Sequence, residues 1–434
     1  MDGTLVYMRI GLFTDTYVPI HNGISYVVQL TRAGLEELGH EVYVFAPSPE
    51  FKYEEQDDHV IRFKAIKGAT YEDDLTSVFF PPTQLQKINK LKLDVIQFYT
   101  PNQVGLLGLM AGLRYDVPVI SQYSTDLYQY VEYYPAAEKV ILGLPIAAPV
   151  VLGGRMKSWS KAIGSLPKHR NLKDWLKRLT AEYATSMHDK CDAVIVLSKK
   201  HKRQLTEWNT KSDIHLIPTG VDPLPRPTVD EVAAFSAKYN LSDSDKIILY
   251  TGRISKEKNL DLPLEAFVQY IAPTHPNVKL MFAGDFDYRE ELEQRALDSG
   301  FGDRIIFTGS FERQKARVIY EAATVYAFAS LTDTQGLVLH EAAGSGLPLV
   351  LCDGELSEIF HPGENGLLAK NEPEDFAVQL LKILNDPKLQ AEMSKKSMAF
   401  AAEFTEAGQI KKLEKLYEHC VATHKPVNFA GGKW

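Results

Sequence analysis

Short apolar runs alternate with helical patterns along this chain, and this alternation restricts the possible folds more than any other feature of the sequence. In the first half the runs are rich in Val, Ile, Leu and Phe and are continuous enough to be strands buried on both faces. They occupy residues 8–13, 41–46, 93–98, 117–121, 193–198 and 214–218. Between the first two, residues 24–38 place apolar side chains on one helical stripe, and Gly39 follows to end the helix. Strands connected by helices in this way predict a parallel, doubly wound sheet.

The same alternation resumes after a proline-rich segment. Residues 222–227, with the sequence DPLPRP, hold three prolines in six positions. Prolines cannot lie within a helix or a central strand, so the segment indicates a linker. Further strand patterns follow at 246–250, 278–283, 304–308, 324–329 and 348–351. We expect an α/β fold of two Rossmann-like domains, 1–222 and 223–405, which face each other across a ligand-binding cleft.

The carboxyl-terminal part of the chain, residues 373–419, is helical in pattern throughout. Its last portion could cover the second sheet or cross back to the first domain, and the sequence is compatible with both. We therefore assign 406–434 as a separate carboxyl-terminal helix.

Composition excludes several other classes of protein. With 45% hydrophobic residues the 434-residue chain can form a folded core, and a net charge of -8 argues against broad nucleic-acid binding. The three cysteines are far apart and His340 has no partner at metal-binding spacing, so we expect neither a disulfide framework nor a metal site. The start of the chain does not resemble a signal peptide, and the longest apolar run, 140–154, is too short to span a bilayer. These features predict a cytoplasmic protein.

The first loop that could bind a ligand, TDTYVPIHNG, joins the first predicted strand to the first helix and ends at Gly23. Glycine would let the backbone approach a ligand closely, and the amino terminus of the helix behind it favours an anion. A plain turn in which Asn22 caps the helix would explain the same residues.

The second loop, TGRISKEKNL, spans 251–260 and directly follows a predicted strand. Arg253 could clamp a diphosphate as a fork and Lys258 as a point charge, while Asn259 could cap the next helix. A solvated charged loop would have the same composition. The position at the carboxyl end of a strand favours ligand binding.

The third segment, TDTQGLVLHEAAGSGLP, spans 332–348 and contains a polar loop followed by a helix. The free backbone amides of Leu337 and Val338 would lie at the start of that helix, where they could bind phosphate. Asp333 and Glu341 could accept hydrogen bonds from sugar and ribose hydroxyls. Alternatively, Asp333 caps the helix and Glu341 is an ordinary helix residue.

Together these segments resemble the retaining glycosyltransferases of family GT4, which have the GT-B fold of two Rossmann-like domains. The resemblance covers nearly the whole chain and rests on RIGLFTDTYVPIHNGI, LEELGHEVYVFAP, IPTGVD, TGRISKEKNL, FAGD, IIFTGSF and TDTQGLVLHEAAGSGLP. It implies a nucleoside diphosphate sugar as co-substrate, with no cofactor and no metal. The segment TDTQGL looks most like the glycolipid-forming members, which glucosylate diacylglycerol.

The resemblance also implies a role for each matching position. The diphosphate would be bound by Gly23, Arg253, Lys258 and the amides near Leu337 and Val338. Glu341 would bind the ribose, and Asp333 would contact the sugar. The implied nucleotide-sugar site comprises Gly23, Arg253, Lys258, Thr308, Gly309, Gly336, Leu337, Val338 and Glu341, and the implied catalytic set comprises Ser124, Asp126, Arg253, Lys258 and Asp333.

Several positions depart from the family pattern. Asp333 is one methylene shorter than the usual glutamate but keeps the carboxylate. Where the relatives read YHTD this chain reads YSTD, so the histidine that contacts the donor sugar is Ser124, which can still donate or accept a hydrogen bond. The H-x-H-T-P strand end is QFYTP at 97–101, and GDGP is GDFD at 284–287. We expect a kept diphosphate site and an altered sugar site.

A basic insertion, 140–178, lies in the first half in spite of the acidic average. After its uncharged beginning it carries Arg155, Lys157, Lys161, Lys168, Arg170, Lys173, Lys177 and Arg178 against one acid, Asp174, and the sequence KKHKR follows at 199–203. Interleaved apolar residues make this typical of an element drawn to anionic lipid, with on the order of 1 kcal/mol per basic residue. An amphipathic helix packed on its own domain has the same composition. The resemblance to glycolipid-forming enzymes favours the membrane.

We therefore expect a hexosyltransferase that is cytoplasmic and peripheral on the inner face of the membrane. It would transfer a hexose, with retention, from a nucleoside diphosphate sugar, with a UDP-sugar favoured, to a hydroxyl of diacylglycerol, another membrane lipid or a saccharide. An alternative is a pseudo-enzyme or assembly subunit that binds the nucleotide sugar without transferring it. An epimerase or phosphorylase of similar fold is disfavoured because no cofactor lysine motif is apparent.

Overall fold

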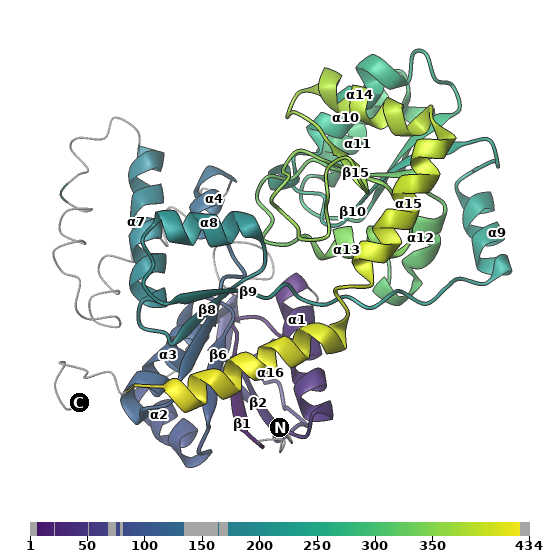
Figure 1. The fold of residues 1–434 in the computed structure, drawn as a ribbon. Helices are drawn as coiled ribbons and strands as arrows, with labels where there is room; N and C mark the ends of the chain where they lie inside the picture. Colours follow the sequence, from purple (N-terminus) through teal and green to yellow (C-terminus); the bar gives the residue numbers. More distant parts are fainter. Residues whose placement is uncertain are drawn as a thin grey trace. The chain divides into compact units, whose positions relative to one another are not determined.

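A computed structural model describes residues 7–20, 22–50, 52–67, 75–78, 81–133, 164 and 172–425 of the chain. It divides into two compact units, each with its own hydrophobic core. The first unit consists of Met1–Pro218 and Glu406–Trp434, and the second of Thr219–Thr405 (Figure 1). The proline-rich segment 222–227 contains no helix or strand and lies at the start of the second unit.

The first unit is built on a parallel sheet of seven strands in the order β3-β2-β1-β6-β7-β8-β9. Its strands are β1 Arg9–Phe13, β2 Glu41–Pro47, β3 Val60–Phe63, β6 Val95–Phe98, β7 Val119–Gln122, β8 Ala193–Val196 and β9 Asp213–Leu216. The central strands are almost entirely buried because helices cover both faces of the sheet. A small antiparallel pair, β4 Ala65–Lys67 and β5 Leu75–Ser77, lies outside the main sheet.

The helices of this unit are α1 Gly23–Glu37, α2 Pro81–Lys90, α3 Gln103–Tyr115, α4 Leu127–Tyr133, α7 Leu172–His188, α8 Lys199–Glu207 and α16 Glu406–Thr423. Helix α16, from the end of the chain, packs against α1. A Cβ atom on Gly34 would lie 2.8 Å from Ile410 of α16, so glycine permits the close approach of the two helices. His40 and Glu414 add a contact of 3.1 Å between their side chains. The carboxyl-terminal helix is therefore part of the first unit.

The second unit contains a parallel sheet of six strands in the order β12-β11-β10-β13-β14-β15. The strands are β10 Lys246–Thr251, β11 Val278–Ala283, β12 Ile305–Phe307, β13 Val325–Phe328, β14 Leu349–Leu351 and β15 Gly366–Leu368. From β10 the chain adds β11 and β12 toward one edge of the sheet, and from β13 it adds β14 and β15 toward the other edge. The loops that follow these two neighbouring strands therefore diverge, and ligands of such sheets bind at that point. The predicted class, α/β with two Rossmann-like parallel sheets, is confirmed.

The main helices of the second unit are α9 Val229–Lys238, α10 Asp261–Ala266, α11 Arg289–Asp298, α12 Arg317–Glu321, α13 Leu337–Gly344, α14 Pro373–Leu384 and α15 Pro387–Ala401. The prediction of continuous helix over 373–419 is wrong. Helix α14 ends at Leu384. Asp386 then caps α15, because its carboxylate accepts the backbone N–H groups of Lys388 and Leu389, and Pro387 occupies the first turn of that helix. A second interruption at 402–405 separates α15 from α16.

Candidate functional site

The loops after β10 and β13 bring Lys258 and Asp333 together. Lys258 Nζ lies 2.8 Å from Asp333 Oδ1, and the two side chains are 13% and 19% exposed. Burial alone would raise the pKa of Asp333, but the charge and hydrogen bond of Lys258 outweigh it and hold that pKa below the usual value. Asp333 is therefore an ionised partner of Lys258, and the alternative in which it caps the following helix is wrong.

Arg253, in the same loop as Lys258, has neighbours on two sides. Its Nη2 atom lies 3.5 Å from Glu257 Oε1, and its guanidinium lies 5.1 Å from the centroid of the Phe286 ring. Phe286 belongs to the loop after β11, which touches the Arg253 loop closely, since a Cβ on Gly284 would lie 1.8 Å from the carbonyl oxygen of Gly252. The close approach thus requires glycine at position 284, and Gly252 has a φ of 132°, which favours glycine there as well.

Helix α13 begins directly after this loop region. Gly336 precedes it with a φ of 69°, a left-handed conformation that favours glycine, and no side chain caps the helix. The backbone amides of Leu337 and Val338 occupy its first two positions, where an α-helix has no internal acceptor for them. The sequence prediction of a helix starting near Gly336 is confirmed, and its amino terminus has the electrostatic character of an anion site.

Glu341 lies on α13 and is buried, with two hydrogen-bond donors facing its carboxylate. Arg313 Nε lies 2.6 Å from Oε1, and the Tyr320 hydroxyl donates to Oε2 over 2.8 Å. The Tyr320 hydroxyl is also 2.9 Å from Thr251 Oγ1, which in turn is 2.9 Å from the Tyr326 hydroxyl. A buried polar network therefore connects Glu341 to the end of β10, so Glu341 is not an ordinary solvent-facing helix residue.

Sequence reasoning did not identify Arg313 and Tyr320. Arg313 lies in a charged run and Tyr320 in a short helix, and neither has a spacing relative to Glu341 that would signal a contact. It also assigned Asn259 wrongly as a helix cap. The Asn259 side chain donates instead to Ala329 O at 3.2 Å and to Asn371 Oδ1 at 2.8 Å, and so connects the loops after β10 and β13.

Thr308 and Gly309 follow β12 at the same carboxyl edge of the sheet. The Thr308 carbonyl oxygen lies 3.5 Å from the Tyr239 hydroxyl, and Gly309 has a φ of 75°. These contacts do not test a role in nucleotide binding, which stays a prediction for both residues.

In the first unit, Gly23 is the first residue of α1, and Asn22 caps this helix by accepting the N–H of Ser25 at 2.9 Å. A Cβ on Gly23 would meet nothing within 4 Å. Asp15 of the same loop is directed elsewhere, because its carboxylate accepts the backbone N–H groups of Val104 and Gly105 at the start of α3. The loop is therefore held by internal hydrogen bonds, and Gly23 is not needed for close packing within the described chain.

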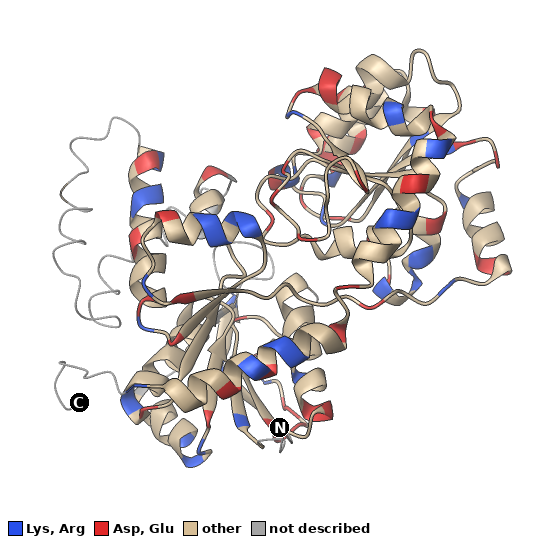
Figure 2. Ribbon diagram, in the orientation of Figure 1, with Lys and Arg blue, Asp and Glu red and all other residues tan. Residues whose placement is uncertain are grey.

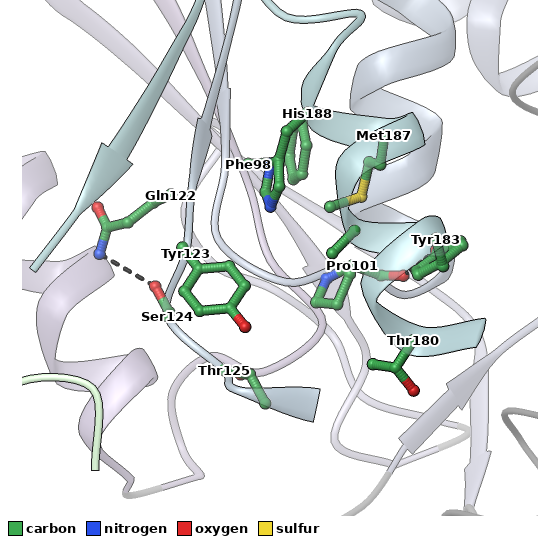
Figure 3. A pocket seen from close by; sticks show the side chains of 11 residues that line it. Phe98, Pro101, Gln122, Tyr123, Ser124, Thr125, Thr180, Tyr183, Met187 and His188 are labelled. Carbon is green, nitrogen blue, oxygen red and sulfur yellow. Dashed lines mark hydrogen bonds between the residues drawn. The ribbon is translucent and has the colours of Figure 1, made fainter. Parts of the chain in front are cut away.

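A chain of hydrogen bonds reaches Ser124 from α16 by way of the neighbouring strands β6 and β7. Tyr417 of α16 donates to Gln97 Oε1 at 2.6 Å, Gln97 Nε2 donates to Gln122 Oε1 at 3.0 Å, and Gln122 Nε2 donates to Ser124 Oγ at 3.1 Å. Figure 3 shows the Gln122 side chain directed at Ser124. Buried amides are costly unless paired, so each link of this chain depends on the next.

Asp126, two residues after Ser124, is buried beside His201 of α8. His201 Nε2 lies 3.5 Å from Asp126 Oδ2, and the Tyr123 hydroxyl donates to Oδ1 at 2.9 Å. Burial would raise the pKa of Asp126, but the neighbouring His201 and the hydrogen bonds from Tyr123 and Gln204 hold it below the usual value. Asp126 therefore anchors the loop that carries Ser124. With 1% exposure it has almost no surface for a substrate.

A small cavity of about 20 Å³ lies next to Ser124, between the ends of β6 and β7 and helix α7 (Figure 3). Its volume is enough for a water molecule but not for a sugar ring. His188 borders it, with Nδ1 2.8 Å from Ser121 Oγ, and burial lowers the pKa of His188 to about 3. The histidine is therefore neutral at physiological pH.

The larger part of the predicted basic insertion lies outside the described residues. This applies to Arg155, Lys157, Lys161, Lys168 and Arg170. On α7, Lys173 and Lys177 approach Glu132 of α4 at 3.5 Å and 2.5 Å. Figure 2 shows the further basic cluster along α8.

Membrane-spanning helices and metal clusters are both missing from the described part of the chain. None of the helices there is both long and apolar enough to cross a membrane. Within the same residues, no group of three or more His, Cys, Asp or Glu side chains could hold a metal ion.

Comparison with known proteins gives consistent matches to both units. Residues 21–223 match the family model described as Glycosyltransferase Family 4, and residues 231–399 match that of Glycosyl transferases group 1. The chain is 27% identical to an alpha-monoglucosyldiacylglycerol synthase of Acholeplasma laidlawii over 94% of its own length and 96% of the relative. A synthase of the same name from Streptococcus pneumoniae is 28% identical over 79% and 70%.

Solved structures agree in fold. Sucrose-phosphate synthase from Thermosynechococcus elongatus has a TM-score of 0.69 at 20% identity and covers 96% of this chain and 99% of its own. Anabaena HepE in complex with UDP and glucose also has a TM-score of 0.69, at 16% identity, covering 95% and 100%.

Proposed function

The chain belongs to glycosyltransferase family 4, and we propose that it transfers a hexose, with retention, from a UDP-sugar to a hydroxyl of a membrane lipid such as diacylglycerol. The observation that carries the donor side is the convergence of Arg253, Lys258 and the uncapped start of α13 at the point where the strand order of the second sheet reverses. Two cations and free helix amides at one strand edge suit a diphosphate. The structure of HepE in complex with UDP and glucose supports this choice of donor.

The proposed chemistry is a substitution at the anomeric carbon of the hexose. The acceptor hydroxyl oxygen forms a bond to that carbon and gives up its proton, while the bond to the diphosphate breaks and the leaving oxygen gains negative charge and can take up that proton. Arg253, Lys258 and the amides of Leu337 and Val338 would stabilise that charge without a bound metal. Gly23 is proposed to contact the same diphosphate. Glu341, already oriented by Arg313 and Tyr320, would accept the ribose hydroxyls.

On the sugar side we propose roles for Asp333 and for Ser124. Asp333 would accept hydrogen bonds from the hexose hydroxyls, because its ionised carboxylate is an acceptor only. Ser124, held by Gln122, would supply the polar contact for which the family commonly uses histidine. Asp126 would act through the position of the Ser124 loop, since it is buried beneath it.

The donor assignment is tested by calorimetry and by product release. Wild-type protein is titrated with UDP, GDP and ADP, and formation of nucleoside diphosphate from the matching sugar donors is then followed. The double variant Arg253→Ala, Lys258→Ala should lose release of nucleoside diphosphate, whereas unchanged turnover would contradict the site. Saturable donor binding by the wild type without transfer to any acceptor would instead identify a nucleotide-sugar-binding subunit that is not catalytic.

The lipid acceptor is proposed from the glycolipid synthases among the relatives and from the basic insertion. The insertion would bind anionic lipid at the inner face of the membrane. Because Lys173 and Lys177 contact Glu132, changing them would also disturb the packing of α7 on α4. The better variant reverses Lys157, Lys161, Lys168 and Arg170 to Glu.

Sedimentation with liposomes tests the membrane proposal. The charge-reversed variant should bind vesicles of phosphatidylglycerol and phosphatidylcholine less than the wild type does. Neither protein should bind vesicles of phosphatidylcholine alone. A control variant that reverses Lys388 and Lys395 of α15 in the second unit should sediment like the wild type. Equal sedimentation of all three proteins would refute the membrane role of the insertion.

A further inference from the structure

Phe286 has a backbone conformation that L-amino acids rarely adopt. Its φ is 152°, and such residues persist only where the surroundings hold them, often at binding sites. The surroundings here are specific: the Phe286 N–H donates to Asp285 Oδ1 at 2.9 Å, and its carbonyl oxygen accepts the N–H of Arg289 at 3.1 Å. The carbonyl oxygen of Asp285 accepts the N–H of Ile254 at 2.9 Å, which ties this loop to the loop of Arg253.

The consequence of this conformation is the place of the aromatic ring. The ring lies against the Arg253 guanidinium at 5.1 Å, while Glu257 Oε1 approaches Nη2 of the same group at 3.5 Å. An aromatic ring attracts the flat face of a guanidinium group. The N–H donors of the guanidinium lie in the plane of that group, so they remain directed away from the ring. The Arg253 side chain is still 41% exposed. It is thus oriented by its neighbours without being buried by them.

We propose that Phe286 is a positioning residue for the donor, whose ring holds the Arg253 guanidinium in the orientation that receives the diphosphate. This inference rests on the proposed function, because it assumes that Arg253 binds a diphosphate. Ordering a long side chain on binding costs conformational entropy, and a ring that orders it beforehand removes part of that cost. The strained backbone at Phe286 costs stability, and tighter binding of the donor would explain why the protein keeps it.

The test measures UDP affinity of the full chain by calorimetry for three proteins. Phe286→Leu removes the ring but keeps apolar bulk and the same backbone demand, while Phe286→Tyr keeps the ring. Leucine should weaken UDP binding roughly 3- to 30-fold, and tyrosine should stay within about twofold of the wild type. Thermal unfolding of each variant shows that it is folded, and tyrosine serves as the conservative rescue.

Two further readouts separate positioning from a general loss of structure. The loss in Phe286→Leu should affect UDP and spare uridine, which has no phosphate for Arg253. In an Arg253→Ala background, Phe286→Leu should add no further weakening. Wild-type affinity in Phe286→Leu, an equal loss for uridine, or a full additional loss in the Arg253→Ala background would each overturn the proposal. A wild-type protein that binds none of UDP, GDP and ADP would contradict the proposed function itself, which is a distinguishable result.

Discussion

Lys258 and Asp333, 75 positions apart in the sequence, form an ion pair of 2.8 Å at the carboxyl edge of the second sheet. The pair joins the residue proposed to bind the diphosphate to the residue proposed to bind the sugar. Because both side chains are largely buried, either one alone would leave a poorly solvated charge. Each side chain therefore neutralises the charge of the other at a place where both are proposed to meet the donor.

We predict that Asp333→Leu and Lys258→Met each lower the free energy of unfolding of the second unit by about 3 kcal/mol. The double variant should cost less than the sum of the two, because an apolar pair leaves no unpaired charge. Urea denaturation of all four proteins measures this. Strict additivity of the two losses would show that the contact carries no coupling.

The same pair separates binding from transfer. Asp333→Asn removes a negative charge beside the diphosphate site, so UDP binding should be unchanged or tighter while hexose transfer falls. Lys258→Met should weaken UDP binding and transfer together. Calorimetry with UDP and a transfer assay check both variants. Weaker UDP binding in Asp333→Asn would contradict the division of roles.

His340 gives the second unit a predictable response to acid. Burial lowers the pKa of this fully enclosed histidine to about 4, below its ordinary value of 6.5. The native state therefore favours the neutral ring, and the unfolded state binds more protons between these two values. Stability is complete above about pH 6.5 and should fall by about 3 kcal/mol as pH drops to 4.

Substitution of the histidine tests the cause of that response. His340→Gln should lower stability at pH 7.5 yet flatten its decline between pH 6.5 and 4, as measured by urea midpoints at each pH. His188 in the first unit has a pKa lowered to about 3 by burial and should behave in the same way over a wider range. An unchanged slope in His340→Gln would assign the acid sensitivity to other groups.

Tyr417 lies at the far end of the hydrogen-bond chain that reaches Ser124 through Gln97 and Gln122. Tyr417→Phe leaves Gln97 Oε1 buried without its donor, at a cost of about 1–3 kcal/mol. Because the two glutamine amides can then reorient, we predict a lower kcat for transfer with little change in UDP affinity.

Tyr183→Phe is the matched control for this variant. Tyr183 is also buried in the first unit and donates to Pro101 O at 2.6 Å. It lines the cavity beside Ser124 but is not a member of the hydrogen-bond chain from Tyr417, so it separates the chain from the packing around the cavity. It should lose similar stability and keep its kcat. Equal kcat in both variants would show that the chain from Tyr417 serves only packing.

The sequence was sufficient for the elements whose signal is local. Continuous apolar runs identified the central strands of both sheets, and the ends of those strands correctly placed Arg253, Lys258 and Asp333 at one edge. Short β3, with the sequence VIRF, was missed because its polar flanks hide the apolar pattern. The break at Asp386 was missed although an acid before a proline is a common helix start.

Side-chain partners across elements could not be predicted in the same way. Arg313 and Tyr320 reach Glu341 from different helical turns, 28 and 21 positions away, and only the packing of those turns on α13 decides the contact. The turn at Phe286 is a similar case, because a positive φ at a phenylalanine contradicts local preference and depends on the hydrogen bonds around it.

Gly23 and Gly284 should respond in opposite ways to alanine, although both are loop glycines by their sequence context. Gly284 has a φ of 151°, and a Cβ there would lie 1.8 Å from a backbone oxygen. Gly284→Ala should therefore lower the free energy of unfolding of the second unit by about 3 kcal/mol or more. A Cβ on Gly23 meets nothing within 4 Å at the start of α1, so Gly23→Ala should keep or raise stability by about 0.4–1 kcal/mol.

A Cβ on Gly23 meets no described atom within 4 Å, so a loss of function in Gly23→Ala with stability retained would indicate contact with a ligand. If the donor diphosphate approaches this backbone as proposed, an added methyl group should raise KM for the sugar donor while thermal unfolding stays at or above the wild-type temperature. Donor kinetics and calorimetric Tm measured on the same preparation decide this. Unchanged kinetics would remove Gly23 from the site, and a lowered Tm would mean that the fold itself requires the glycine.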